Sequence, residues 1–338
     1  MFIPNHTAQD SAVAAVVPKL DLSQVDLSKL TVGFEFEFVS RLSHKSFAKS
    51  LQLAQPTWKI GTVQDKHGLP KNVKDVEKYS VWNVTSDETV QEDAEDLLSL
   101  TPHYSIELIS PVLQLNQVGD ILTRVFSLIK STGGKTNESC GLHVTFGHPD
   151  INSALTKFDP LKLGIFLRED NLLSRFGRTD NAFADNLSKR IVQAINTEIG
   201  SSGDQVTTLK GLNVFDHTPT SIPTTDKTGP KLTDANLAQI LVSPAFRKRM
   251  AMVDHYTNIS LQYLSKHRVE IRGMGGDYLN VSVKELTGRV LHMARCVAIA
   301  LMPTAYVPQY VAAVRRMMPV YKAPKKPMWT PAKSDGDE

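Results

Sequence analysis

The 338-residue sequence contains only two cysteines, Cys140 and Cys296. Two cysteines cannot form a disulfide framework or a cysteine-rich zinc site. Such low usage is typical of a reducing compartment, and we expect a cytoplasmic protein. No Cys-His-Asn pattern surrounds Cys140, so a small buried side chain explains it better than a nucleophile.

Two glycine-rich phosphate-binding signatures are also missing. The sequence has neither a P-loop of the form Gly-x-x-x-x-Gly-Lys-Ser/Thr nor a Gly-x-Gly-x-x-Gly dinucleotide fingerprint. A nucleotide, if the protein uses one, must therefore be held chiefly through metal ions and Arg or Lys side chains.

Long apolar runs and targeting segments are absent too. Residues 290–307 are the best membrane candidate, but His292, Arg295 and Pro303 interrupt them. This stretch predicts a buried helix, and we expect no membrane partner. Residues 1–19 lack the basic segment and apolar core of a secretion signal.

The net charge is only +3, with 22% charged and 41% hydrophobic residues. This composition allows a sizeable core and argues against disorder and against a dedicated nucleic-acid protein. The lysines at 322–333 could contact phosphates, but a short basic end is more often simply solvated. The sequence leaves the oligomeric state open.

The pattern of elements predicts an α+β fold. We expect a curved antiparallel sheet with helices packed on its apolar face. Strands are predicted at 31–39, 104–109, 141–147 and 268–273, with short strands and turns at 58–84. Helices are predicted at 118–129, within 155–199 and from Ser282 to about Leu301, where Ser282 and Glu285 form a capping box.

One domain accounts for most of the chain. Residues 1–28 are expected to form a flexible lead-in, residues 29–321 a single catalytic domain, and residues 322–338 a disordered basic tail. Residues 201–234, rich in Gly, Ser, Thr, Pro and Asp, predict a long loop or lid.

The first strand alternates phenylalanine with glutamate over residues 33–38. Because side chains alternate across a strand, Glu35 and Glu37 share one face and the phenylalanines the other. Two residues span about 6.6–6.8 Å, which suits carboxylates that hold neighbouring divalent cations. The alternative is an amphipathic strand whose charged face meets water.

Three later strands repeat the pattern. Glu107 opposes apolar neighbours in the second strand, His143 and Thr145 do so in the third, and Glu270 and Arg272 in the fourth. A single histidine of this kind would more often be structural than a ligand. A solvated sheet face, however, typically carries Lys, Thr, Ser and Gln, whereas this one has glutamates, His and Arg.

Clustered carboxylates repel one another unless a cation neutralises them. Oxygen ligands with one imidazole suit Mg²⁺, or Mn²⁺, better than a thiol-binding metal. Arg272 can grip a phosphate with two parallel hydrogen bonds. The residues together are typical of a site for metal-bound nucleotide phosphates.

Five segments follow one another in a recognisable order. They are Gly-Phe-Glu-Phe-Glu37, Trp82 with Asp87, Ser105-Ile-Glu-Leu-Ile-Ser-Pro111, Asn137 with Ser139-Cys-Gly-Leu-His-Val144, and Val269-Glu-Ile-Arg272. This order resembles the amidoligase family of carboxylate–amine ligases, related to glutamine synthetase and glutamate–cysteine ligase. The resemblance covers residues 31 to about 300 and implies a glutamine synthetase-like catalytic core. Glu88, where the family turn has Gly, and the lack of a second His after His143 depart from the pattern.

The resemblance implies the roles of particular residues. Glu35, Glu37, Glu107, His143 and Glu270 would be metal ligands, and Glu35, Glu37, Glu107 and Arg272 would be catalytic. Arg272 would also meet the phosphates of ATP, as would Arg175 and Arg178, which lie in a segment similar to the family's central helical Arg motif. Tyr256 and Asn258 also fit its pattern. For Arg175 and Arg178, ordinary helix-surface charge is an equal alternative. Asp87 could lie near the site, although turn chemistry explains it almost as well.

The implied reaction joins a carboxylate to an amine at the expense of ATP, through an acyl phosphate. Small-molecule or peptide carboxylates and amines are the expected substrates. Two other hypotheses stay open, a metal-dependent hydrolase on the same residues and a non-catalytic protein that keeps the fold.

Overall fold

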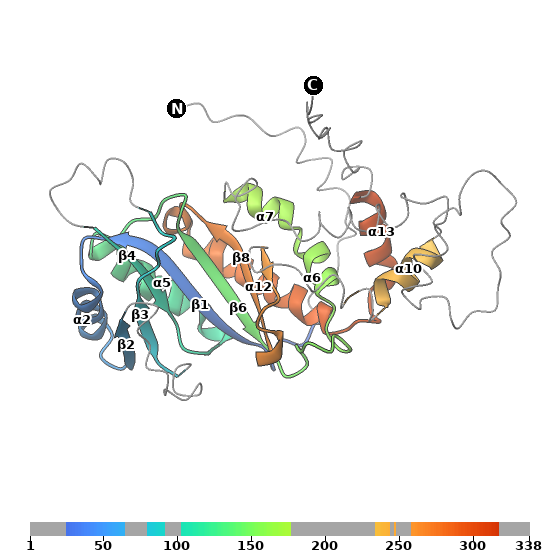
Figure 1. Cartoon of the computed structure of the whole chain (residues 1–338), viewed down its shortest axis with the longest axis horizontal. Coiled ribbons are helices and arrows are strands. Elements are labelled where there is room, and N and C mark those ends of the chain that lie inside the picture. The colour runs from blue at the N-terminus through green and yellow to red at the C-terminus, as the bar shows by residue number, and fades with distance from the viewer. Residues whose placement is uncertain are drawn as a thin grey trace, which may run out of the picture.

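One open sheet of eight strands forms the centre of the protein, and Figure 1 shows it as a twisted layer beside the helices. The computed structural model describes residues 25–64, 80–91, 103–176, 234–243, 247 and 258–317. The strands are β1 (Thr31–Ser40), β2 (Ile60–Gln64), β3 (Trp82–Thr85), β4 (Tyr104–Ile109), β5 (Leu113–Gln114), β6 (Gly141–Gly147), β7 (Ile259–Ser260) and β8 (Arg268–Gly275). The α-helices are α2 (His44–Ala54), α5 (Val118–Ser131), α6 (Pro160–Leu167), α7 (Glu169–Arg175), α10 (Asp234–Val242), α12 (Val283–Ala300) and α13 (Val307–Met317). Short 3-10 turns are η2 (Leu115–Gln117), η3 (Leu264–Lys266) and η4 (Tyr278–Asn280).

The strands lie in the order β2-β3-β4-β1-β6-β8-β7, and β5 pairs with β1. The predicted mixed fold with a mostly antiparallel sheet is therefore confirmed. One pair corrects the expectation of a purely antiparallel sheet, because β2 and β3 run parallel. A parallel pair requires a crossover connection between its two strands, and most of the residues between β2 and β3 lie outside the described ranges.

Local signals placed several elements well. The strands predicted at 104–109 and 141–147 coincide with β4 and β6. Helix α5 begins at Val118 as predicted, and Gly133, with φ 74°, follows its C-terminal end in the left-handed conformation that glycine favours. The Ser282 side chain accepts a hydrogen bond from the backbone N–H of Glu285 and so caps α12.

The helical prediction for 155–199 was too broad at its start. Helix α6 begins only at Pro160, because the Asp159 side chain accepts hydrogen bonds from the N–H groups of Leu161 and Lys162. Arg168 then takes a left-handed conformation that separates α6 from α7. The part of the prediction beyond residue 176 lies outside the described residues.

Three helices had no sequence prediction: α2, α10 and α13. Helix α2 carries a signal that could have revealed it, since Ser43 caps its N-terminus and Phe47, Ala48 and Leu51 recur at helical spacing. The predicted loop at 201–234 and the tail at 322–338 lie outside the described residues, except that Asp234 begins α10.

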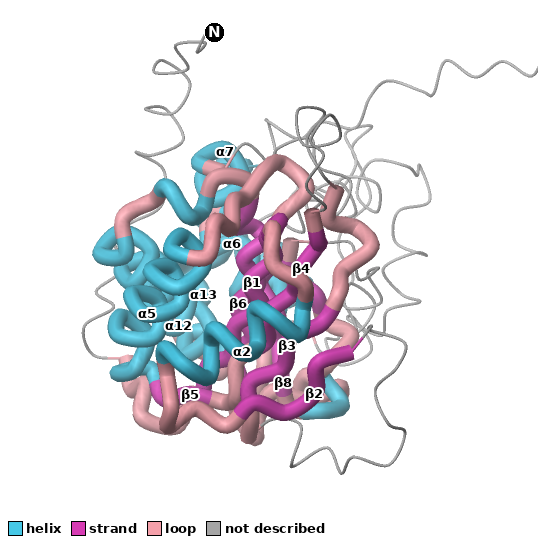
Figure 2. Tube along the Cα trace, turned by 90° about the vertical axis from the view of Figure 1, so that its left-hand side faces the viewer, coloured by secondary structure: helices cyan, strands magenta, loops and turns pink. Residues whose placement is uncertain are grey.

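Helices cover one face of the sheet, as Figure 2 shows for α5 and α12. The phenylalanines of β1 lie on this face. The Phe36 ring centroid is 6.4 Å from that of Phe126 on α5, and the Phe38 centroid is 5.0 Å from that of Phe47 on α2. The predicted packing of helices on the apolar face is thus confirmed, and the glutamates of β1 face the other way.

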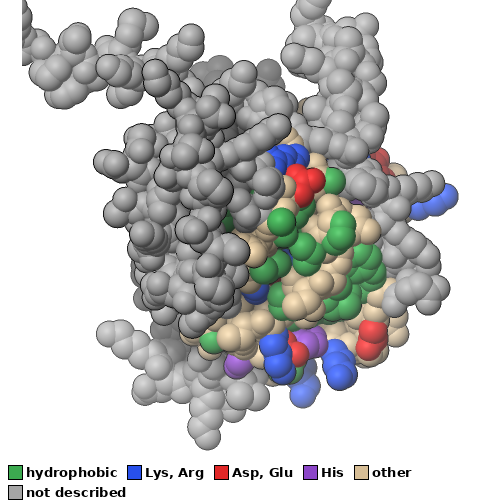
Figure 3. Space-filling view, turned by 90° about the vertical axis from the view of Figure 1, so that its right-hand side faces the viewer, with side chains coloured by type: hydrophobic (Ala, Val, Ile, Leu, Met, Phe, Trp, Pro, Cys, Tyr) green, Lys and Arg blue, Asp and Glu red, His purple; other side chains and the backbone are tan. Residues whose placement is uncertain are grey.

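The surface at the α10 and α13 end is mixed. Figure 3 shows hydrophobic and neutral surface there, with Lys and Arg side chains in separate places among it. Among the described helices, none has the length and apolar character needed to cross a membrane.

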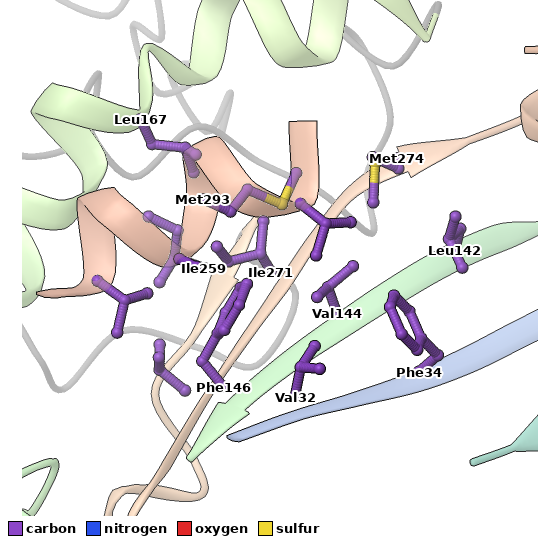
Figure 4. Packing of buried hydrophobic residues seen from close by; sticks show 14 of the residues in the cluster. Val32, Phe34, Leu142, Val144, Phe146, Leu167, Ile259, Ile271, Met274 and Met293 are labelled. Atoms are coloured by element: carbon purple, nitrogen blue, oxygen red, sulfur yellow. The ribbon is translucent and has the colours of Figure 1, made fainter. Parts of the chain in front are cut away.

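The same core continues under β6 and β8. Figure 4 shows Val144, Phe146 and Ile271 packed together with Leu167 of α6 and Met293 of α12. All five are almost fully buried. This packing holds β1, β6 and β8 rigidly side by side, and it is on their opposite face that the polar residues gather.

Candidate metal centre

Strand β1 brings its two glutamates opposite polar residues of both neighbouring strands. Glu37 pairs with Glu107 of β4, and Glu35 pairs with His143 of β6. Directly opposite residues have Cβ atoms about 4.5–5.5 Å apart, so their side chains meet on the polar face. The alternation read from the sequence is therefore in register across three strands.

Strand β3 adds a third carboxylate. Thr85 pairs with Glu107, and its hydroxyl donates a 2.9 Å hydrogen bond to Glu107 Oε2. Asp87 follows two residues later, and its Oδ1 accepts hydrogen bonds from both the backbone N–H and the hydroxyl of Thr89, at 2.9 and 2.7 Å. Oxygen atoms of Glu37, Asp87 and Glu107 lie within 4.8 Å of one another. We call these three buried residues the acidic triad.

Strand β8 adds the remaining groups through a β-bulge. Val144 pairs with Ile271 but Leu142 pairs with Met274, so two residues of β8, Arg272 and Gly273, lie opposite His143. The bulge keeps Arg272 with the polar groups while it returns Met274 to the core.

Glu270 completes a second group of ligand atoms. His143 Nδ1 lies 3.2 Å from Glu35 Oε2 and 3.4 Å from Glu270 Oε1. One ligand atom from each of these three residues lies within 4.8 Å of the other two. We call Glu35, His143 and Glu270 the histidine triad. Arg272 Nη1 lies 3.4 Å from Glu270 Oε1, so a guanidinium stands at its edge.

His143 lies between the two triads. Its Nε2 atom is 3.5 Å from Glu37 Oε1, while its Nδ1 atom faces the histidine triad. Gly141 makes this arrangement possible, because a Cβ at that position would lie 2.5 Å from His143 Nε2 and 2.9 Å from Glu37 Oε2. The absence of a side chain at residue 141 is thus a condition of the site.

Burial and mutual repulsion shape the electrostatics. Burial of Glu37, together with the charges of Asp87 and Glu107, raises the pKa of its carboxyl to about 8. Without a cation Glu37 therefore holds a proton at neutral pH, and a cation would take that proton's place. The Tyr278 hydroxyl donates a 2.9 Å hydrogen bond to the backbone carbonyl of Glu37 and so anchors β1 at this residue.

The donor atoms suit a hard divalent cation. Both triads offer carboxylate oxygens, and the single nitrogen ligand comes from His143. No thiol takes part. Such a set matches Mg²⁺ or Mn²⁺ and disfavours metals that prefer sulfur.

The structure brings some of the predicted site residues together and leaves others elsewhere. All five predicted metal ligands lie in the two triads, and Arg272 stands beside Glu270. Arg175 instead forms a 3.2 Å ion pair with Glu285 of α12, and its predicted role stays a prediction. Arg178 and Tyr256 lie outside the described residues. The Asn258 carbonyl accepts a 2.7 Å hydrogen bond from the Arg272 N–H, which supports β8 at the bulge.

Two residues near the site were missed or undervalued. Asp87 was predicted either to lie near the site or to serve a turn; it is buried and completes the acidic triad. The pairing of β3 with β4, which the sequence alone does not show, brings it there. Tyr263 was not considered at all. Burial and the charges of Glu270 and Glu35 raise the pKa of its hydroxyl to about 12.

A sheet with two adjacent groups of metal-ligand type defines a class of candidate metalloenzyme. Comparison with known families narrows this class to one family. Residues 28–198, just over half of the 338-residue chain, match a family model described as "Putative amidoligase enzyme". The chain therefore belongs to this amidoligase family. Searches of curated proteins and of solved structures found no match to it.

Proposed function

We propose that this chain is an ATP-dependent ligase that joins a carboxylate to an amine. In this reaction the carboxylate attacks the γ-phosphate of ATP and ADP leaves, which gives an acyl phosphate. The amine then attacks the acyl carbon, loses a proton and displaces phosphate to form an amide. The observation that carries the proposal is the pair of ligand triads around His143, with Arg272 at their edge, in a chain of the amidoligase family.

The histidine triad and the acidic triad would each hold one divalent cation, Mg²⁺ or Mn²⁺. Bound there, the cations would neutralise charge on the phosphoryl group during its transfer. The proposal also places the sheet among the glutamine synthetase-like catalytic cores, in which carboxylates on strands hold the metals.

The chain's own residues have separable tasks. Arg272 would donate hydrogen bonds to phosphate oxygens, because its side chain is 20% exposed and lies beside Glu270 at the site edge. Glu35 would reach the open side of the site, since its side chain is 28% exposed while His143 is nearly buried. The Glu107 carboxylate would stay oriented through the hydroxyl of Thr85.

The test is ATP turnover by the full chain with Mg²⁺ or Mn²⁺, screened against pools of carboxylates and amines. We expect ADP and phosphate to be released together only when both kinds of substrate are present. Glu35→Gln should lower turnover by roughly 100-fold or more, because it removes a charged ligand. Asp120→Asn, an equal charge change at an exposed position of α5, should leave turnover unchanged.

Other outcomes would exclude the proposal. Amide cleavage without nucleotide would identify a hydrolase instead. Calorimetry that detects no binding of Mg²⁺–ATP, together with no amide cleavage, would favour a non-catalytic protein. Equal turnover by wild type and Glu35→Gln would show that the role assigned to Glu35 is wrong.

A further inference from the structure

A tight turn directly after β3 carries Asp87 to the acidic triad. The backbone N–H of Val90 donates a 3.2 Å hydrogen bond to the Asp87 carbonyl and closes the turn, while the Asp87 carboxylate accepts its hydrogen bonds from Thr89. Aspartate is favoured at the first position of such a turn, because its side chain can bond the backbone two residues further on. These bonds fix the carboxylate within the turn, so the place of the turn decides where the carboxylate lies.

A second turn of the same kind lies directly before β6. The N–H of Cys140 donates a 3.0 Å hydrogen bond to the Asn137 carbonyl, and Asn137 Oδ1 accepts one from the Ser139 N–H at 3.0 Å. The Cys140 carbonyl in turn accepts a 2.9 Å hydrogen bond from the N–H of Gly276, just beyond β8. This second turn is therefore fixed to the sheet.

Three hydrogen bonds join the two turns through the backbone of Gln91. Its N–H donates to Ser139 Oγ at 2.8 Å, and its carbonyl accepts from Asn137 Nδ2 at 2.7 Å. The Ser139 hydroxyl donates to Asn137 Oδ1 at 2.6 Å and so closes the ring. We call these three hydrogen bonds the latch. They use two side chains before β6 and, from Gln91, only backbone atoms.

The latch ends a segment that crosses half of the sheet. Strands β4 and β1 lie between β3 and β6, so residues 86–91 pass both strands on the way from β3 to the latch. They pass on the polar face, because Asp87 meets Glu37 and Glu107 there. Three strand spacings amount to about 14–15 Å, which six extended residues can span. The segment is thus held at both ends, by the pairing of β3 with β4 and by the latch.

We propose that Asn137 and Ser139 are positioning residues of the metal centre, which keep Asp87 in the acidic triad by holding the backbone of Gln91. The histidine triad does not need this support, because Glu35, His143 and Glu270 lie on paired strands. The latch therefore acts on one of the two cations only. This inference rests on the proposed function, which supplies the cations, and adds to it that the two sites depend on different parts of the chain.

Calorimetric titration of the nucleotide-free full chain with Mn²⁺ tests the latch. Two variants assign the sites, since Glu35→Gln removes a charge from the histidine triad and Asp87→Asn removes one from the acidic triad. Ser139→Ala removes the acceptor of the Gln91 N–H, and Asn137→Ala removes the donor to its carbonyl. Gln91→Ala is the matched control, because it keeps both backbone groups of the latch.

We expect Ser139→Ala and Asn137→Ala each to weaken the site that Asp87→Asn weakens, by roughly tenfold, and to leave the other site as in wild type. Gln91→Ala should bind like wild type. The double variant of Asp87→Asn with Ser139→Ala should bind little worse than Asp87→Asn alone, because the latch acts through Asp87.

Several results would overturn the inference. Equal weakening of both sites would indicate a general loss of structure, and losses that add up in the double variant would show that the latch does not act through Asp87. Wild-type affinity in both latch variants, with one site still weakened by Asp87→Asn, would remove the latch and leave the proposed metal centre intact. A wild-type chain that binds no Mn²⁺ would contradict the metal centre itself, and the latch inference with it.

Discussion

Lys162 and Glu37 are both buried charged groups, but what surrounds them differs. Burial lowers the pKa of Lys162 to about 8 and raises the pKa of Glu37 to about 8. Lys162 Nζ donates hydrogen bonds to the carbonyls of Met302, Pro303 and Ala305 at 2.7–2.9 Å. Glu37 instead shares its surroundings with two other carboxylates.

The two environments indicate different roles, a structural one for Lys162 and a ligand-binding one for Glu37. Around Lys162 the protein supplies the opposing groups itself, including the carboxylate of Asp159, which lies 3.7 Å from Arg247 Nε. Around Glu37 the protein gathers three carboxylates, and a bound cation would relieve their mutual repulsion. The surroundings of Lys162 therefore stabilise the fold, whereas those of Glu37 indicate a ligand.

The largest change in stability should come from replacing Lys162, whose charge the fold itself compensates. Lys162→Met deprives three backbone carbonyls of their donor and removes a buried cation near Asp159. We expect it to lower the free energy of unfolding by about 3–5 kcal/mol, measured by chemical denaturation. Lys157→Met, an exposed lysine paired with Asp150, should change it little. A stability loss no larger than that of the control would remove the contrast between the two regions.

A substitution at Gly141 should damage the metal site. The Cβ of Gly141→Ala would meet His143 Nε2 and Glu37 Oε2, so the imidazole must move. We expect Mn²⁺ affinity, measured by calorimetry or paramagnetic relaxation, to fall about 10- to 100-fold. Unchanged affinity would mean that His143 has no part in binding the cation.

The pH dependence of stability should expose Glu37 directly. Between pH 5.5 and 7.5 the folded metal-free protein keeps a proton on Glu37 that the unfolded chain has lost. Stability should therefore fall as pH rises, with a contribution from this group of up to about 1.4 kcal/mol per pH unit. Lys162, whose pKa in the folded protein is also about 8, begins to lose its proton only near the top of this range, and there it adds a slope of the opposite sign.

Asp159, whose pKa burial also raises, contributes to the same slope, so Glu37→Gln is the needed comparison. The variant should have the shallower slope, and saturating Mg²⁺ should remove the Glu37 contribution from wild type. Identical slopes for the two proteins without metal would argue against a raised pKa at Glu37.

The smallest change in stability should come from replacing a glycine that lies outside the acidic triad and the histidine triad. A Cβ at Gly288 on α12 meets no atom within 4 Å. Gly288→Ala should stabilise the protein by about 0.5–1 kcal/mol through helix propensity and leave Mn²⁺ affinity unchanged. This variant shows, beside Gly141→Ala, that the cost at residue 141 comes from the site and not from glycine replacement in general.

Local patterns in the sequence determined the elements and their faces. Alternation put Glu35 and Glu37 on one side of β1, apolar spacing located α5, and Ser282 marked the start of α12. These signals depend on neighbours within a few residues, which is why they could be read without a structure. Helix α2 had such a signal as well and was overlooked.

Only the tertiary structure decided how the polar groups divide. The pairing of β3 with β4 brought Asp87 to Glu107, the pairing of β6 with β8 brought Glu270 to His143, and the bulge in β8 set Arg272 opposite His143. The ion pair of Arg175 with Glu285 likewise joins residues 110 apart in the sequence. Register, bulges and long-range pairs depend on the packing of the whole chain, so the sequence by itself determined which residues carry the chemistry but not how they are grouped.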